Sequence, residues 1–83
     1  MTYYEVCAES IVYGEYPKAF SKIKQAEAYF ENRVEQAEDD GGNLEITLNE
    51  VVEYYDGKCE CSTLKKAIIE LDDGKWVARR IEC

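Results

Sequence analysis

The chain has 83 residues, of which 46% are hydrophobic and 34% are charged, and its formal net charge is −8. This length supports one hydrophobic core, so we expect a single domain over residues 1–83. The apolar content is too high for a disordered chain, and no stretch approaches the roughly 20 apolar residues that a membrane helix needs. The first residues do not follow the pattern of a signal peptide. We therefore expect a folded, cytoplasmic protein without membrane contact.

The first predicted element is a strand from Tyr3 to about Val12, because apolar and polar residues alternate there with a period of two. Residues 14–17 end this strand. Pro17 suits the first turn of a helix, because its fixed φ is helical and its missing N–H would have no intrahelical partner. We therefore expect a helix from about Lys18 to Glu38.

Apolar residues recur at spacings of three and four through this predicted helix and form one stripe along it. They are Ala19, Phe20, Ile23, Ala26, Phe30, Val34 and Ala37. One flank of the stripe carries four glutamates and the other carries basic residues. The glutamates are Glu27, Glu31, Glu35 and Glu38, and the basic residues are Lys18, Lys22 and Arg33. Like charges four residues apart destabilise a helix, so local helix stability does not explain the glutamate flank.

The segment after the helix predicts a series of antiparallel strands. Leu44, Ile46 and Leu48 alternate with polar residues, and the pattern breaks at residues 51–52. Either the strand bulges and continues to Tyr55, which we favour, or a capping box over residues 47–50 opens a short helix. Asp56-Gly57 and Asp73-Gly74 predict two-residue hairpins. The sequence therefore predicts an α+β fold of order β-α-β-β-β, with a single helix packed on one face of an antiparallel three- to four-stranded sheet.

One helix covers one face of such a sheet, yet the predicted strands carry apolar or aromatic residues on both faces. Tyr3, Cys7 and Ile11 alternate with Tyr4, Val6 and Ala8, and Trp76 and Ala78 alternate with Val77 and Ile81. The pattern leaves open which face of the last strand is buried. An exposed apolar sheet face is often an interface, and the seven tyrosines favour one. We expect a homodimer or a partner contact through this second face; scattered exposed apolar residues are the alternative.

The residue inventory does not favour catalysis. The chain has no histidine, and pairs among its 18 carboxylates carry little information. Its four cysteines are Cys7, Cys59, Cys61 and Cys83. We expect reduced thiols in a cytoplasm, because a four-thiolate metal site usually has paired Cys-x-x-Cys knuckles; a disulfide stays open as an alternative. The sequence thus predicts a protein that is not an enzyme, with no catalytic residues, no metal and no cofactor.

Negative charge is concentrated between Glu27 and Glu60, where eleven acidic residues stand against two basic ones. Such a surface can steer towards a basic protein, while it opposes direct nucleic-acid binding. We therefore expect a protein-binding module whose partner has a basic surface, such as a nucleic-acid-handling complex. The candidate partner-binding residues are Glu27, Glu31, Glu35, Glu38, Asp39 and Asp40, with Tyr54 and Tyr55 as anchors.

Successive glutamates on a helix stand about 6 Å apart, whereas duplex DNA carries a charge about every 1.7 Å, so loop and strand acids must contribute to any imitation of nucleic acid. A short, acidic, helix-on-sheet chain without catalytic residues resembles in profile the inhibitors that phages use against host defence, including anti-CRISPR proteins. This likeness of profile, which rests on no motif, implies an inhibitor that occupies a basic groove. The alternatives are a structural or dimerisation domain with solubilising acidity and an RNA-binding sheet domain.

Overall fold

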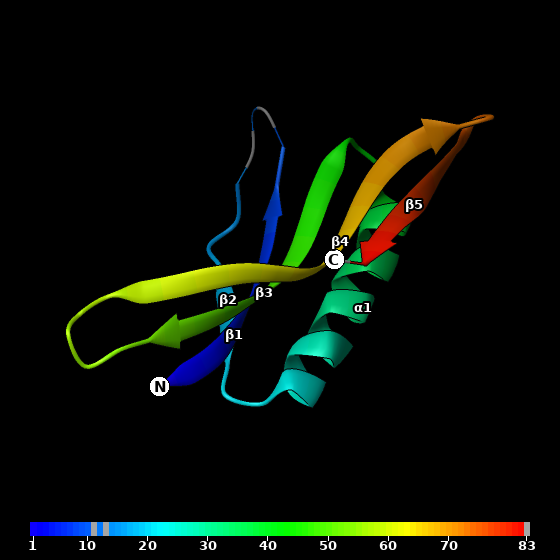
Figure 1. The fold of residues 1–83 in the computed structure, drawn as a ribbon. Helices are drawn as coiled ribbons and strands as arrows, with labels where there is room; N and C mark the ends of the chain where they lie inside the picture. Colours follow the sequence, from blue (N-terminus) through cyan, green and yellow to red (C-terminus); the bar gives the residue numbers. More distant parts are fainter. Residues whose placement is uncertain (11, 13, 83) are drawn as a thin grey trace.

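The computed structural model describes residues 1–10, 12 and 14–82. Within these residues the element order is β1 (Thr2–Glu9), β2 (Lys18–Phe20), α1 (Ile23–Asp40), β3 (Leu44–Glu53), β4 (Cys59–Asp72) and β5 (Lys75–Glu82). The strands form one antiparallel sheet in the spatial order β2-β1-β3-β4-β5, and α1 packs on one face of it (Figure 1). The predicted α+β architecture is confirmed, and the strand number is corrected to five.

The extra strand comes from the segment predicted as the start of the helix. Lys18–Phe20 pairs with β1, with Phe20 opposite Tyr4 and Lys18 opposite Val6. Pairing with β1 gives the backbone groups of this segment partners that the start of a helix does not provide. The prediction that the helix begins near Lys18 is therefore wrong, because tertiary pairing outweighs the local signal of Pro17. The helix begins at Ile23, after Lys22 in an extended conformation.

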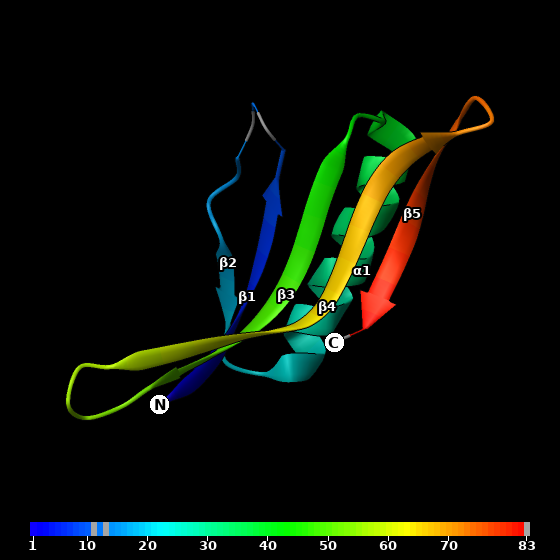
Figure 2. The ribbon, with the colours of Figure 1, turned by 45° about the horizontal axis from the view of Figure 1, so that its top comes forward.

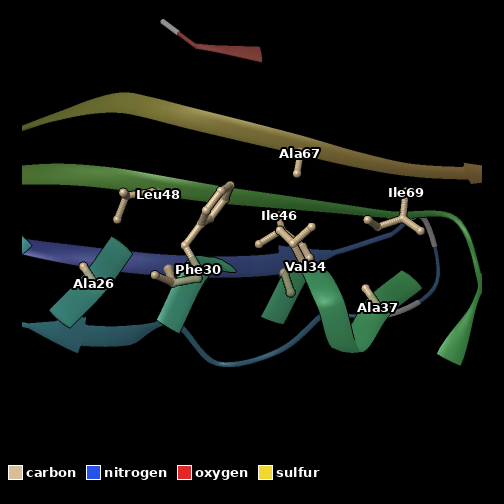
Figure 3. Packing of buried hydrophobic residues seen from close by; sticks show 10 residues of the cluster. Ala26, Phe30, Val34, Ala37, Ile46, Leu48, Ala67 and Ile69 are labelled. Atoms are coloured by element: carbon tan, nitrogen blue, oxygen red, sulfur yellow. The ribbon is translucent and has the colours of Figure 1, made fainter. Parts of the chain in front are cut away.

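The helical stripe is confirmed from Ala26 onwards. Ala26, Phe30, Val34 and Ala37 are buried and face the sheet (Figure 3). The strand residues of the core are Val6, Ala8, Ile46, Leu48, Ala67 and Ile69. Trp76 and Ala78 also pack against this core, which settles the face of the last strand: these two residues lie on the helix side of β5. Val77, Arg79 and Ile81 therefore lie on the opposite face, which we call the open face.

The β3–β4 hairpin confirms a strand over the alternative of a short helix at residues 51–55, but this strand ends before Tyr55 and does not carry the predicted bulge. β3 runs without interruption to Glu53. Leu48 pairs with Lys65 and Asn49 pairs with Thr63, so Leu64 is the extra residue and the irregularity lies in β4. Beyond it, residues 49–63 extend away from the helix, and we call them the arm (Figure 2). The arm contributes to the longest dimension of the molecule, 49 Å.

Of the two predicted two-residue hairpins, the one at Asp73-Gly74 is confirmed and the one at Asp56-Gly57 is wrong, because the connection between β3 and β4 is longer. Asp73 and Gly74 have φ angles of 50° and 79° and form the predicted two-residue turn between β4 and β5. Residues 54–58 form a longer loop at the tip of the arm, where the N–H of Tyr54 donates to the carbonyl of Lys58 at 2.8 Å. The first predicted strand ends at Glu9, before Val12. The predictions for Ile11, Tyr13 and Cys83 lie outside the described residues.

Candidate partner-binding surface

The glutamate flank of α1 faces the basic strands β4 and β5. Glu27 pairs with Lys65 at 3.2 Å, and Glu31 pairs with Arg80 at 2.6 Å. These two pairs join helix residues to strand residues 38 and 49 positions away in the chain. Both pairs are partly exposed, so each adds at most about 1 kcal/mol to stability. Part of the flank therefore orients the helix on the sheet.

Glu38 contacts the edge of the sheet. Its Oε2 accepts a hydrogen bond from the backbone N–H of Ala78 in β5 at 3.3 Å. The pairing of β5 with β4 leaves alternate backbone groups on its outer edge, where a second chain could add a strand. The Glu38 carboxylate already accepts from the outward-pointing N–H of Ala78. A second strand that paired with β5 would have to displace this hydrogen bond, so strand addition at β5 is less favourable.

The remaining candidates on α1 are exposed. Glu35, Asp39 and Asp40 lie in the last turns of the helix, where no basic residue is present. Trp76 lies against Gly41 at the end of the helix, so an added Cβ at Gly41 would overlap the indole ring. This contact brings the exposed Asp72 and Asp73 of the β4–β5 turn to the same end of the molecule. The negative end of the helix dipole adds to the potential there.

Tyr54 and Tyr55 lie at the tip of the arm, far from the acids at the end of the helix. The helix connects through residues 41–43 to the start of β3, whereas the tip follows the end of β3. A strand of ten residues spans about 30 Å, so these two groups occupy opposite ends of β3. The structure therefore brings Asp39 and Asp40 together but separates them from both tyrosines. The candidates form two surfaces.

The arm carries its own negative charge. Glu50, Glu53, Asp56 and Glu60 lie on it, and Lys58 is its only basic residue. Asp56 is 4.0 Å from Lys58, and both side chains are well exposed. Tyr55 is fully exposed, and the Tyr54 hydroxyl donates a hydrogen bond to Glu60 at 3.2 Å. The charge of Glu60 and this hydrogen bond raise the pKa of Tyr54, so Tyr54 remains a neutral donor at physiological pH.

The open face is polar at its centre. Asn49 joins three strands there: it accepts from Thr63 at 2.8 Å and donates to Thr47 at 3.3 Å and to the Cys7 sulfur at 3.7 Å. Two ion pairs flank this cluster, Lys66–Glu45 at 3.3 Å and Arg79–Glu70 at 3.0 Å. Among the described residues, no helix or loop covers this face (Figure 1). The face combines this network with the half-buried side chains of Ile68 and Val77.

The described cysteines, Cys7, Cys59 and Cys61, are free. Burial, followed by the charge of Glu5, raises the pKa of Cys7, so its thiol is mostly protonated at neutral pH and a poor nucleophile. In residues 1–10, 12 and 14–82, no three or more histidine, cysteine or carboxylate side chains are placed to hold a metal ion. None of the helices in that part of the chain combines the length and apolarity needed to cross a membrane.

Sequence reasoning missed the partners of the helix flank. Lys65 and Arg80 follow the acidic segment in the sequence, and only the strand order shows that they lie beside Glu27 and Glu31. It also left the arm carboxylates out of the candidate set. Glu53 and Glu60 lie on either side of Asp56-Gly57, which predicts a turn. Their position next to this turn indicates that they lie near the two tyrosines.

Comparison with known proteins does not identify a relative of this chain. No family model matches the chain, and no curated protein or solved structure shows a significant match to it.

Proposed function

We propose that this protein is a small acidic binding module that acts in the cytoplasm, without catalysis, by contacting a partner protein with a basic surface. The observation that carries the proposal is the arm. It projects beyond the helix-covered core (Figure 2), and its tip combines exposed tyrosines with carboxylates. Aromatic side chains are frequent anchors of protein interfaces, and surrounding charges increase the rate of encounter with an oppositely charged partner.

Ion pairs within the chain compensate more of the negative charge outside the arm than on the arm. Most basic side chains of β4 and β5 are in ion pairs with carboxylates of the same chain. Glu50, Glu53 and Glu60 have no ion pair with a basic residue among the described residues. The negative charge available to a partner is therefore concentrated on the arm and at the end of α1, where Glu35, Asp39 and Asp40 are exposed.

The form of this function that we propose is inhibition. A projecting hairpin can enter a groove, and a groove lined by lysine and arginine is the usual binding site of nucleic acid. An acidic arm with aromatic side chains supplies both features that such a groove binds, negative charge and flat rings. A phage inhibitor of host defence, similar in action to an anti-CRISPR protein, fits this description. Glu27, Glu31 and Glu38 then support the contact by orienting the helix.

The proposal is tested by capturing the partner and then changing the arm. Tagged protein is incubated with a nuclease-treated host lysate, eluted with a salt gradient, and the eluate is identified by mass spectrometry. We expect a nucleic-acid-handling complex that elutes at moderate salt. With the purified partner, Tyr55→Ser is expected to weaken binding by at least about tenfold, because a buried anchor contributes about 2 kcal/mol or more. Glu53→Lys is expected to shift elution to lower salt.

Glu9→Lys provides the matched control, because Glu9 is an exposed acid on β1, outside both candidate surfaces, and the change in net charge is the same. It is expected to leave elution close to that of the wild type. Equal effects of Glu9→Lys and Glu53→Lys would show that net charge alone directs binding. Unchanged affinity of Tyr55→Ser would exclude the tip of the arm as an anchor.

A homodimer through the open face is the second candidate function, and the uncovered position of Ile68 and Val77 favours it. If it forms, light scattering of the wild type gives the mass of two chains, and Val77→Glu gives the mass of one. Gln36→Glu on the outer surface of α1 adds the same charge and is expected to leave the dimer intact. A wild-type monomer at all accessible concentrations would exclude this role.

A further inference from the structure

A hollow of about 720 Å³ lies beyond the end of β1, next to the start of β3 and the C-terminal end of α1. Its size is within the usual range of ligand pockets. Its apolar lining residues include Ala37 from the helix, Leu44 at the start of β3 and Ile69 from β4. Ala37 and Ile69 are 2% and 0% exposed and belong to the core, so this wall is fixed by the packing of the fold (Figure 3).

The rim of the hollow is acidic. Asp40, Glu45 and Glu70 line it, and Glu45 and Glu70 are held in place by Lys66 and Arg79. Asp40 is exposed and has no ion pair among the described residues. Its carboxylate is therefore the group on this rim whose charge is least compensated within the chain.

The end of the helix adds to this negative potential. Asp40 is the last residue of α1, and Gly41 and Gly42, which follow it, also line the hollow. Of the last carbonyls of the helix, that of Ala37 accepts from the N–H of Gly41 at 2.8 Å. The helix C-terminus carries a partial negative charge that favours a cation near the last turn.

Arg33 is the basic residue of the lining, and its charge is already engaged. Its Nε donates to Glu15 at 3.0 Å and its Nη2 donates to the other oxygen of the same carboxylate at 2.6 Å. This two-point pair fixes the guanidinium and compensates its charge. Arg33 therefore forms a rigid wall and opposes a second cation only weakly.

We infer that this hollow binds the side chain of an arginine or lysine presented by a protein partner. Such a side chain has an apolar stem, which matches Ala37, Leu44 and Ile69, and a cationic head, which matches Asp40 and the helix C-terminus. The inference rests on the proposed function and adds to it a second contact, at the opposite end of β3 from the arm. A neutral side chain of the same shape would use only the apolar wall.

The test uses capped peptides and the whole ¹⁵N-labelled protein, and it needs no knowledge of the partner. Acetyl-Ala-Arg-Ala-amide, its lysine counterpart and its citrulline counterpart are titrated while amide resonances are recorded by NMR. Citrulline has nearly the shape of arginine without the charge. We expect the cationic peptides to shift the amides of Ala37, Gly41, Gly42, Leu44 and Ile69, and the citrulline peptide to shift them far less. Whichever cationic peptide binds more tightly identifies the preferred side chain.

Asp40→Asn is expected to weaken binding of the better peptide by about two- to fivefold, the size of one exposed charge contact. Asp39→Asn is the matched control, because Asp39 is the preceding exposed acid and does not line the hollow. Equal loss in both variants, equal shifts with citrulline, or no shifts at these amides would overturn the inference. Shifts confined to residues 54–59 would overturn the hollow as the site while leaving the arm as a basic-partner surface. Failure of the lysate capture alone would count against the proposed function and leave the hollow standing.

Discussion

Replacement of Phe30 by alanine is expected to lower the free energy of unfolding by about 3–5 kcal/mol. Phe30 is 1% exposed and is the largest fully buried side chain of the core, between α1 and the sheet. Its removal loses the transfer free energy of the ring and leaves a cavity that Val34, Ile46 and Leu48 can close only in part. A domain of this size has a total stability of about 4–12 kcal/mol, so the loss is at least about a quarter of the total and unfolds the chain outright at the lower limit.

Urea unfolding followed by far-ultraviolet circular dichroism measures this effect. Gln36→Ala is the control, because Gln36 lies on the exposed surface of the same helix and alanine favours helix. That variant is expected to change stability by less than about 0.5 kcal/mol. A loss below about 1 kcal/mol for Phe30→Ala would mean that the ring does not lie in the core of the protein in solution.

The core was predictable from the sequence because it depends on local periodicity. Ala26, Phe30, Val34 and Ala37 recur at the helical period, and Ile46 and Leu48 alternate with polar residues at the strand period. Each pattern determines its own buried face without knowledge of the partner element. The type of the turn at Asp73-Gly74 was predictable for the same reason, since both positions need a positive φ.

The start of the helix was not predictable in this way. Lys18–Phe20 has no strong preference of its own, and its conformation is decided by its pairing with residues of β1 that lie 12 to 16 positions earlier in the chain. The extra residue in β4 was not predictable either. The break in the alternation at residues 51–52 indicates an irregular pairing of strands, but it does not show which strand holds the extra residue. Leu64 was identified only from the pairing of β3 with β4.

The candidate surface was predictable only as a list of charges. Helical spacing places Glu27, Glu31, Glu35 and Glu38 on one flank, and the structure agrees with that placement, since Glu27, Glu31 and Glu38 all contact β4 or β5. The strand order of the sheet, with β1 between β2 and β3, decides which strands lie beside the glutamate flank. The sequence does not specify that order. The difference between a charge paired within the chain and a charge available to a partner is therefore a tertiary property.

Gly41→Ala is expected to lower the free energy of unfolding by about 2–6 kcal/mol, a loss comparable with that of Phe30→Ala. Gly41 has φ 76° and ψ 179°, a backbone conformation that is almost restricted to glycine and costs other residues about 1–3 kcal/mol. A Cβ there would also lie 2.7 Å from Cδ1 of Trp76, so the indole ring must move. Forcing extra volume into a packed contact typically costs a further 1–3 kcal/mol or so.

Gly42→Ala separates these two causes. Gly42 is the next residue and also has a positive φ, 100°, but an added Cβ there meets nothing within 4 Å. It is expected to show the backbone cost alone. Trp76 is the only tryptophan of the chain, so its fluorescence reports the second cause directly. Gly41→Ala is expected to shift the emission to longer wavelength as the ring becomes exposed, and Gly42→Ala to leave it unchanged.

Because the same contact positions the end of α1 beside the hollow, Gly41→Ala is also expected to weaken the peptide response at Leu44 and Ile69. Equal stability losses with unchanged emission in both variants would show that Trp76 does not pack on Gly41 and that the end of the helix is held by the backbone alone.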